Sequence, residues 1–461
     1  MLFPTFTFAL FFMVVLTVGW LVPGRRAWWK LFMLAAGYFF YGYWDVRFVA
    51  LIAASTVLNQ TAAAWLARLR RPGARRAVVS IAVAANLASL GFFKYAGFFV
   101  DSAESALAGL GLAADLPLLN IILPVGISFF TFQAVSYVVD VYRGDSEPAK
   151  PLDFAVYLAF FPQLVAGPIV RAHELIPQFN EPRDLRRTDF TRAFTLIAAG
   201  LFKKMVVATY LAEALVDDVF AFPDRFGPLE VLLGVYGYAV QIYADFSGYT
   251  DIAIGLALLL GIRLPDNFDQ PYRAASLQEF WRRWHMSLSR WLRDYVYIPL
   301  GGNRGSERRR DRNLLVTMLL GGLWHGAAWT FVLWGALHGL GLLAERRLGR
   351  RLPGIVARLV TFHFVCFGWI LFRAESLSAA GSVLGRLFST APASAGLSWV
   401  PAALIAAALA VHFWPPAASE RAVWAASYLP VAVTALAFAF WLVVLEQFGP
   451  EGVAPFIYFQ F

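Results

Sequence analysis

The chain has 461 residues, of which 59% are hydrophobic and only 15% are charged, and its formal net charge is +9. In soluble globular proteins about half of the residues are apolar and about a quarter are charged, so this composition excludes an ordinary soluble protein. The basic residues fall in loops between apolar runs, a pattern typical of cytoplasmic membrane loops near anionic lipid headgroups. This distribution argues against nucleic acid as the partner.

Apolar runs long enough to span a bilayer recur along the chain, and they predict helices because barrel strands would alternate polar and apolar residues. We predict an all-α polytopic membrane protein of about ten crossing helices with re-entrant segments, in a single domain over residues 1–461. The first run, Phe3 to Val22, has no base before it and is expected to be a retained span with its amino end outside. The tail, residues 448–461, is then expected outside as well. The single cysteine, Cys366, excludes an intramolecular disulfide.

The apolar segment from Phe154 to Val170 has basic residues on both sides, so a full crossing would place one basic cluster outside. It also contains Pro162, Gly167 and Pro168, which interrupt helices. We predict that this segment enters the membrane and returns on the same side, shielded by protein. A surface-lying amphipathic segment is the alternative.

Two neighbouring runs carry polar residues at membrane depth. Lys203 and Lys204 lie about three turns into one span, where they either reach the interface or face a polar cavity. The run from Leu229 to Ile262 is too long for one straight crossing, and its middle, QIYADFSGYTD, contains Asp245 and Asp251. We predict a broken helix that faces a central cavity. An interfacial loop between two hairpin helices is the alternative.

The stretch LQEFWRRWHMSLSRWLRDYVYIPLGG places apolar residues on one face of a helix, with arginines around the rest: Trp281, Trp284, Leu288, Trp291 and Tyr295. This arrangement predicts an amphipathic helix that lies in the membrane interface. His285 flanks the apolar face. Spacing alone leaves open whether His285 is functional or an ordinary hydrogen-bonded residue.

The stretch GGLWHGAAWTFVLWGALHG lies in an apolar run between the basic loops 304–312 and 346–351. Because both flanks are basic, the run should enter the membrane and return, and its glycines offer places to turn. A helical first arm would put His325 roughly 18 Å deep, near the middle of the hydrocarbon layer. A buried His325 should be neutral and available as a base. His325 and His338 would face different directions, so we expect no shared metal site.

The sequence lacks the HExxH, CxxC, GxSxG, P-loop and dinucleotide-binding motifs. Metal-dependent, serine-hydrolase and nucleotide chemistry are therefore not expected. Acyl transfer to a hydroxyl needs one base and a dry site, which suits an intramembrane histidine. The residues alone leave a transporter or channel open as well, although the related halves that many transporters contain are not visible in the sequence.

Three motifs together carry a specific resemblance: YADFSGYTDIAIGLALLLGIRLPDNFDQPY, EFWRRWHMSLSRWLRDYVYIPLGG and LLGGLWHGAAWTFVLWGALHG. With PVGISFFTFQAVSYVVDVYRG, FFPQLVAGPI and the closing FIYFQF, they resemble the membrane-bound O-acyltransferase family, in particular its bacterial alginate O-acetylation branch. The resemblance covers nearly the whole chain. It implies a ring of helices around a central tunnel that joins a cytosolic donor side to an external acceptor side.

The resemblance implies that His325 is the catalytic histidine and that His285 is the second polar residue of the site. It also suggests the terminal Tyr458 as an acyl relay, with anchoring of the tail at the interface as the alternative. Three further residues are expected to line the tunnel or bind the donor: Trp324, Asp245 and Arg283. The resemblance assigns no role to His338 or His173, and we expect both to be packed or hydrogen-bonded.

The activity that the resemblance implies is transfer of an acyl group, expected to be acetyl, from a cytosolic thioester to an extracytoplasmic polysaccharide such as alginate. Expected partners are acyl-CoA or an acyl carrier protein as donor, a periplasmic acetyltransferase, the polysaccharide and membrane lipids. No permanently bound cofactor and no metal are expected. D-alanyl transfer to teichoic acid and O-acetylation of peptidoglycan or cellulose are the alternatives. The expected location is the bacterial inner membrane, as a multi-pass protein.

Overall fold

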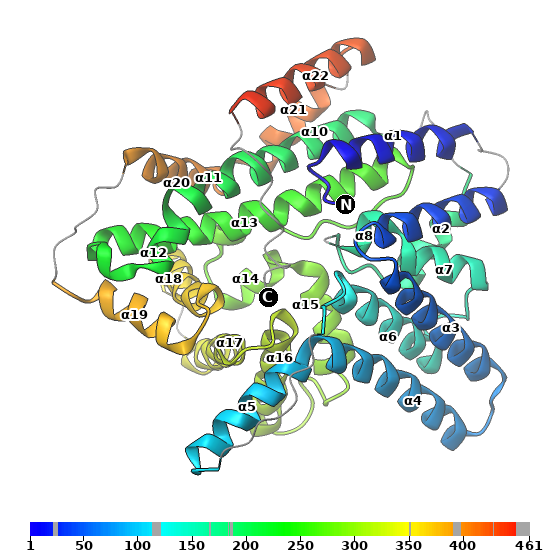
Figure 1. Cartoon of the computed structure of the whole chain (residues 1–461), viewed down its shortest axis with the longest axis horizontal. Coiled ribbons are helices and arrows are strands. Elements are labelled where there is room, and N and C mark those ends of the chain that lie inside the picture. The colour runs from blue at the N-terminus through cyan, green and yellow to red at the C-terminus, as the bar shows by residue number, and fades with distance from the viewer. Residues whose placement is uncertain are drawn as a thin grey trace. The chain divides into compact units, whose positions relative to one another are not determined.

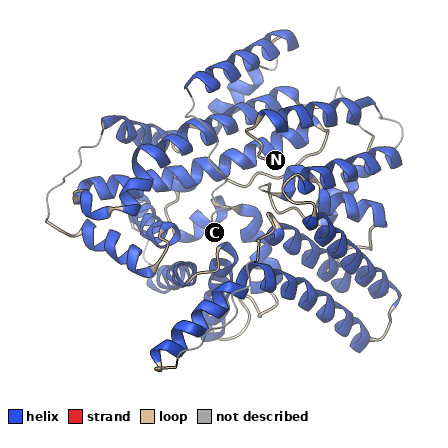
Figure 2. Cartoon of the chain, viewed as in Figure 1, coloured by secondary structure: helices blue, strands red, loops and turns tan. Residues whose placement is uncertain are grey.

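The structure is a computed structural model that describes residues 1–21, 26–112, 121–165, 167–182, 184, 188–349, 352–390, 398–426 and 428–448. In these ranges the regular structure is helical and contains no strand (Figure 2). The prediction of an all-α protein is therefore confirmed for the described residues.

The chain divides into two compact units, and the first comprises Met1–Thr188 together with Ala257–Leu264. Its helices are α1 (Phe6–Leu21), α2 (Arg26–Gly42), α3 (Arg47–Arg68), α4 (Pro72–Leu90), α5 (Ala96–Gly109), α6 (Ile127–Arg143), α7 (Pro151–Ala159), α8 (Phe161–Leu164) and α9 (Ala172–Leu175) (Figure 1). A π-helical turn, Gly91–Tyr95, joins α4 to α5, and a 3-10 helix, Ile176–Asn180, follows α9.

The second unit comprises Asp189–Leu256 and Pro265–Phe461. Its helices are α10 (Phe190–Leu201), α11 (Thr209–Leu211), α12 (Asp217–Ala221), α13 (Pro228–Leu259, whose last turn belongs to the first unit), α14 (Leu277–Arg283), α15 (Met286–Leu292), α16 (Glu307–His325), α17 (Trp329–Leu348), α18 (Gly354–Arg373), α19 (Leu377–Leu387), α20 (Trp399–Val411), α21 (Pro416–Ala426) and α22 (Val431–Phe448). The π-helical segments Phe202–Ala208 and Ala212–Val216 connect α10, α11 and α12, and a third, Arg293–Tyr297, follows α15. Two 3-10 turns are Pro223–Arg225 and Pro271–Arg273.

Four helices of the described residues are long and apolar enough to cross a membrane: Arg47–Arg68, Pro72–Gly109, Phe190–Ala221 and Gly354–Arg373. Three shorter apolar helices accompany them: Phe6–Leu21, Trp399–Val411 and Ala432–Leu445. Helices of this kind bury their backbone hydrogen bonds internally, as lipid requires. The chain is therefore a multi-pass membrane protein.

The segment from Phe154 to Val170 is broken and buried, as predicted. Helix α7 ends at Ala159, and Pro162 lies in the first turn of α8, where its missing N–H costs no hydrogen bond. The side chains of Tyr157 and Phe161 are fully buried, and the Tyr157 hydroxyl donates a hydrogen bond to the Val170 carbonyl at 2.8 Å. This burial contradicts the alternative of a surface-lying amphipathic segment.

The prediction of a broken helix between Leu229 and Ile262 is wrong. Helix α13 runs unbroken for 32 residues, which corresponds to roughly 48 Å. Asp245 and Asp251, which suggested a break, are paired with lysines of the preceding helix. Gly248 serves packing, because a Cβ there would lie 2.8 Å from the Gly200 carbonyl oxygen. The polar residues are therefore neutralised within an intact helix.

Candidate active site

A helical hairpin positions His325. Helix α16 ends at His325, the chain turns over residues 326–328, and α17 returns beside α16 (Figure 1). The helices touch at glycines: a Cβ on Gly322 would lie 2.3 Å from the Phe331 carbonyl oxygen, and a Cβ on Gly335 would lie 2.5 Å from that of Met318. The predicted return of the chain is seen as a hairpin with His325 at its tip, and its entry into the membrane stays a prediction.

His285 lies at a break between two short helices, so the prediction of one amphipathic helix is wrong. Helix α14 ends at Arg283, α15 starts at Met286, and His285 has the left-handed backbone angles φ 43° and ψ 55°. Such a conformation costs on the order of 1–3 kcal/mol for a non-glycine residue and is concentrated at functional sites. The predicted apolar face packs largely inside the protein, and its buried members are Trp284, Leu288 and Trp291.

The two histidines face each other within the second unit. The ring centroids of His285 and His325 are 6.4 Å apart, and both side chains are buried. Trp324 contacts both rings, with centroid distances of 5.8 Å to His285 and 5.0 Å to His325. Phe246 of α13 packs edge-on against His285 at 4.7 Å, and Phe372 of α18 contacts His325 at 5.2 Å. Aromatic rings therefore surround a pair of imidazoles, an arrangement that suits proton transfer away from water.

Asn267, which the sequence analysis did not single out, holds His285. Its side-chain oxygen lies 3.3 Å from His285 Nδ1 and accepts hydrogen bonds from the Ser287 backbone N–H at 3.0 Å and the Ser287 hydroxyl at 2.9 Å. Asn267 is 1% exposed. The only available signal was an amide residue in the LPDNFDQPY motif, between two apolar segments.

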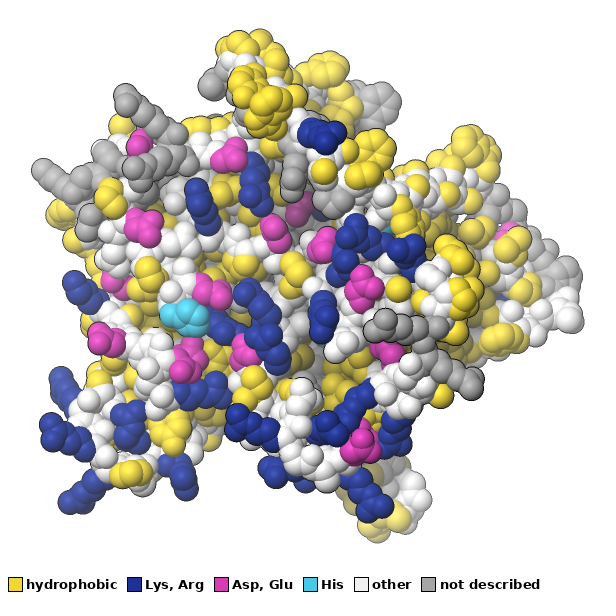
Figure 3. Space-filling model, turned by 180° about the vertical axis from the view of Figure 1, so that it is seen from behind, with side chains coloured by type: hydrophobic (Ala, Val, Ile, Leu, Met, Phe, Trp, Pro, Cys, Tyr) yellow, Lys and Arg dark blue, Asp and Glu magenta, His cyan; other side chains and the backbone are white. Residues whose placement is uncertain are grey.

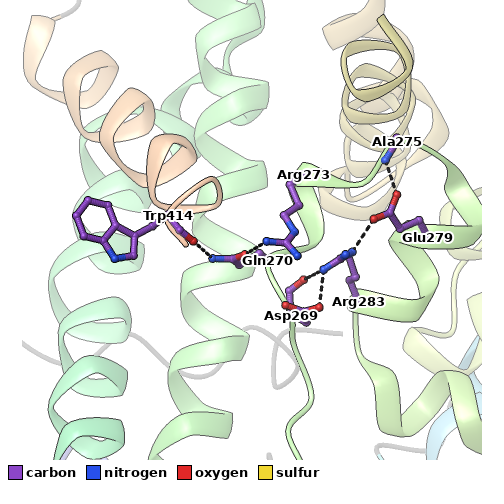
Figure 4. Close-up of polar contacts among 7 residues, drawn as sticks. All are labelled: Asp269, Gln270, Arg273, Ala275, Glu279, Arg283 and Trp414. Carbon is purple, nitrogen blue, oxygen red and sulfur yellow. Dashed lines mark hydrogen bonds and ion pairs between the residues drawn. The ribbon is translucent and has the colours of Figure 1, made fainter. Parts of the chain in front are cut away.

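Arg283 braces the loop that contains Asn267. Its guanidinium forms ion pairs with Asp269 and Glu279, and it also donates to the Asp269 carbonyl at 3.1 Å (Figure 4). Backbone hydrogen bonds join the same segments, from the Asp269 N–H to the Arg283 carbonyl at 2.9 Å and from the Met286 N–H to the Asn267 carbonyl at 3.0 Å. Arg283 therefore has a positioning function in this structure, and its expected contact with the donor stays a prediction.

Figure 4 also shows the hydrogen bonds of Gln270, the residue that follows Asp269 in this loop. Gln270 donates to the Trp414 carbonyl at 2.8 Å and accepts a hydrogen bond from Arg273. Gln270 shares with His285 a positive φ, and these two are the non-glycine residues of the described chain with that conformation. Both lie in the stretch that brings Asn267 to His285, so the local strain is concentrated at this site.

Of the other expected site residues, Asp245 pairs with Lys204, and Tyr458 lies outside the described residues. His338 lies on the far side of Trp334, whose ring contacts His338 at 4.7 Å and His325 at 5.1 Å. His173 belongs to the first unit, where its Nδ1 lies 3.4 Å from Asp140. The structure thus brings His285, His325 and Trp324 together and keeps His338 apart from His285.

Comparison with known proteins gives consistent matches. A family model described as "MBOAT, membrane-bound O-acyltransferase family" matches residues 125–371, just over half of the chain. The probable alginate O-acetylase AlgI of Pseudomonas aeruginosa is 44% identical over 400 residues, which cover 84% of this chain and 75% of that protein. The peptidoglycan O-acetyltransferase of Helicobacter pylori is 38% identical over 389 residues, 77% of this chain and 73% of that protein. The teichoic acid D-alanyltransferase of Bacillus subtilis is 29% identical over 281 residues, 56% and 70% respectively.

Proposed function

Because this chain belongs to the membrane-bound O-acyltransferase family, we propose that it moves an acetyl group from a cytosolic thioester to an extracytoplasmic polysaccharide. The family assigns the chain as a multi-pass membrane O-acyltransferase. The acetyl group, the cytosolic donor and the polysaccharide acceptor are our proposal. The observation that carries the proposal is the buried pair of His285 and His325 in an aromatic enclosure, with ring centroids 6.4 Å apart. Burial keeps the thioester from hydrolysis while the hydroxyl attacks.

His325 is the proposed general base. The hydroxyl oxygen attacks the thioester carbonyl carbon and forms the new C–O bond, while His325 takes the hydroxyl proton. Collapse of the tetrahedral intermediate breaks the C–S bond, and the proton passes from His325 to the departing sulfur to give a free thiol. His285 positions the donor or completes the tunnel, and the ring of Trp324 contacts both imidazoles.

The donor is proposed to approach the basic end of the α16–α17 hairpin. Exposed arginines gather there: Arg304, Arg308, Arg309, Arg312, Arg346 and Arg347. Asp311 pairs with Arg346 and Arg347, and Glu307 lies 3.6 Å from Arg310, so these carboxylates offset only part of the positive charge. Lys and Arg side chains are also numerous on the face shown in Figure 3. An excess of positive charge raises the local concentration of an anionic donor, such as acyl-CoA or an acyl carrier protein.

The proposed acceptor and the proposed location in the cell rest on the family resemblance and on the names of the relatives. Alginate is the first proposed acceptor, because several relatives at 40–44% identity are named as probable alginate O-acetylases. Peptidoglycan, teichoic acid and cellulose are the alternatives. We further propose a bacterial inner-membrane location, one domain over residues 1–461 with about ten crossings around a tunnel, and a periplasmic acetyltransferase that completes the transfer. Asp245 and Arg283 are expected near the tunnel or the donor.

The test is acetylation of the polymer in cells that carry single variants of this chain. His325→Ala, checked for insertion and for an unchanged elution profile in detergent, should abolish acetylation. His363→Ala is the matched control, because that exposed histidine bonds to Tyr236 at 2.7 Å on another part of the unit. A folded His325→Ala protein that still supports acetylation ends the enzyme proposal.

Tyr458 is proposed as an acyl relay on the outer side. An ester on its hydroxyl would carry the acetyl group from the site to the exported partner. Mass spectrometry of the carboxy-terminal peptide, isolated under turnover, should then show an acetyl adduct that Tyr458→Phe removes. Absence of the adduct in an active protein excludes the relay and leaves direct transfer.

A further inference from the structure

Asn267 is built into the site by contacts that fix its side chain from several directions. Its backbone carbonyl accepts the Met286 N–H at 3.0 Å, and its side-chain oxygen accepts the Ser287 N–H at 3.0 Å. Both partners follow His285 directly in sequence. The amide of Asn267 therefore lies against the start of α15, at the residue where His285 adopts its left-handed conformation.

These contacts settle which atom of the amide faces His285. A backbone N–H can only donate, so the atom 3.0 Å from the Ser287 nitrogen must be the amide oxygen. The same oxygen lies 3.3 Å from His285 Nδ1. Because that oxygen is an acceptor, a hydrogen bond between them requires a proton on Nδ1.

A neutral imidazole carries one N–H, so a proton on Nδ1 leaves a lone pair on Nε2. Among the described residues, Nε2 of His285 has no hydrogen-bond partner, and the whole side chain is 0% exposed. The rings around it are Phe246 of α13 and Trp324 and His325 of α16, and His325 is the titratable group that faces it. A buried acceptor without a partner is costly, and such a cost is typical of a site that binds a ligand.

We propose that Asn267 is a positioning residue that fixes His285 as the Nδ1–H tautomer, so that Nε2 meets the substrate as a hydrogen-bond acceptor. The substrate group placed there must present a hydrogen, from a hydroxyl of the acceptor or an amide of the thioester arm. Neutral His285 then cannot donate a hydrogen bond to the thioester carbonyl oxygen. This inference rests on the proposed acyl transfer for its chemical meaning, but the tautomer itself is independent of it.

The direct test is a measurement on the full chain in lipid nanodiscs, without substrate. Ring-¹⁵N histidine labelling distinguishes a protonated nitrogen from one with a lone pair, and the chain has six histidines. A difference spectrum against His285→Gln assigns the signals of His285. We expect protonated Nδ1 and unprotonated Nε2; the opposite pattern overturns the inference whatever the activity, whereas inactivity with the expected pattern counts against the proposed function alone.

Variants then test whether the tautomer matters. Asn267→Leu removes the acceptor at similar volume and should mix the two tautomers in the ¹⁵N spectrum. It should also lower kcat by roughly 10- to 100-fold, the range found when a partner that orients a metal-ligating histidine is lost, with a smaller change in KM. Asn313→Leu is the matched control, because Asn313 is equally buried but bonds to the Gly302 carbonyl at 3.2 Å.

The pH dependence of kcat in Asn267→Asp separates positioning from a purely structural role, because a structural role alone would leave that pH dependence unchanged. The aspartate keeps the acceptor oxygen and adds a negative charge beside Nδ1–H, which stabilises the protonated imidazolium. Since only neutral His285 has a free lone pair, the acid limb of the kcat profile should move to higher pH. An unmoved acid limb in a folded Asn267→Asp protein, or full kcat in folded Asn267→Leu, overturns the positioning role.

Discussion

The ammonium of Lys204 and the carboxylate of Asp245 form an ion pair in which the two side chains are only 2% and 3% exposed. The pair joins the π-helical segment after α10 to the middle of α13. The residue after Asp245 is Phe246, whose ring packs against His285. The ion pair therefore fixes the part of α13 that forms one wall of the candidate site.

Breaking this pair by removing one charge should be costly. Lys204→Met leaves the Asp245 carboxylate buried without its counterion, and we expect a loss of about 3–5 kcal/mol in the free energy of unfolding. Thermal unfolding in detergent measures the loss. The double variant Lys204→Met with Asp245→Leu removes both charges and should recover most of it. A Lys204→Met protein with the wild-type thermal midpoint would contradict a buried ion pair at this position.

The second pair of the same helices supplies the comparison. Lys203 and Asp251 are 22% and 23% exposed, and Lys203 Nζ lies 2.6 Å from Asp251 and 3.0 Å from the Ser247 hydroxyl. Because this pair is more exposed, the charge that remains after Lys203→Met is less costly. Lys203→Met should therefore lower the thermal midpoint less than Lys204→Met. The reverse order would mean that burial does not set the cost.

The glycine contacts of the hairpin give another prediction. Gly335→Ala would push a methyl group to 2.5 Å from the Met318 carbonyl oxygen, and this backbone atom cannot move as a flexible side chain would. We expect a loss of about 1–3 kcal/mol in stability and a lower kcat, because the hairpin carries His325 at its tip. The measurements are thermal unfolding and single-turnover acetyl transfer.

Gly381→Ala is the control for that substitution, since no atom of the described residues beyond its own helical turn lies within 4 Å of a Cβ at Gly381, and its helix, α19, is far from His325 in sequence. This variant should be neutral or slightly stabilising, because alanine has the higher helix propensity. If Gly335→Ala behaves like Gly381→Ala, the close approach of α16 and α17 is not required for the site.

The sequence predicted those features whose signal is local. Prolines and glycines between basic flanks identified the broken segment at Pro162. The basic loops at both ends of a later apolar run identified the hairpin whose first helix ends at His325. The pairing of His325 with His285 came from the family resemblance, because no spacing rule relates two histidines on different helices. The charge pattern thus predicted the path of the chain better than it predicted the contacts between helices.

Features that depend on distant partners were missed. Asp245 and Asp251 looked too costly for an intact helix, because their counterions, Lys204 and Lys203, belong to the preceding helix. The aromatic spacing around Trp284 fits one continuous helix, yet the chain breaks at His285, where Asn267 of a preceding loop caps the turn. Propensity and periodicity describe a segment alone, and here tertiary hydrogen bonds decide its shape.

Arg283 allows two roles to be separated experimentally. If it is the brace seen here, Arg283→Ala frees the Asp269 loop, lowers the thermal midpoint and reduces kcat by loosening Asn267. Hydrogen bonds to charged groups are worth about 1.5–3 kcal/mol, which sets the size of the effect. Arg283→Lys keeps the charge and loses the forked geometry, so it should rescue only in part. A raised KM for the acyl donor with an unchanged midpoint would instead assign Arg283 to donor binding.

His338 provides the sharpest contrast with His325, because the two differ in partners and in surroundings. The ring of His338 is 0% exposed and packed between aromatic side chains of α14 and α17, and neither of its nitrogens has a hydrogen-bond partner among the described residues. Removing an unsatisfied buried polar group in favour of an apolar one of similar volume is neutral or stabilising. His338→Leu should therefore keep full acetylation and an equal or higher thermal midpoint, whereas His325→Ala loses activity. His338→Gln leaves a buried polar group at this position, so it should not raise the thermal midpoint. A folded His338→Leu protein without activity would show that His338 acts in the reaction, through Trp334 or directly.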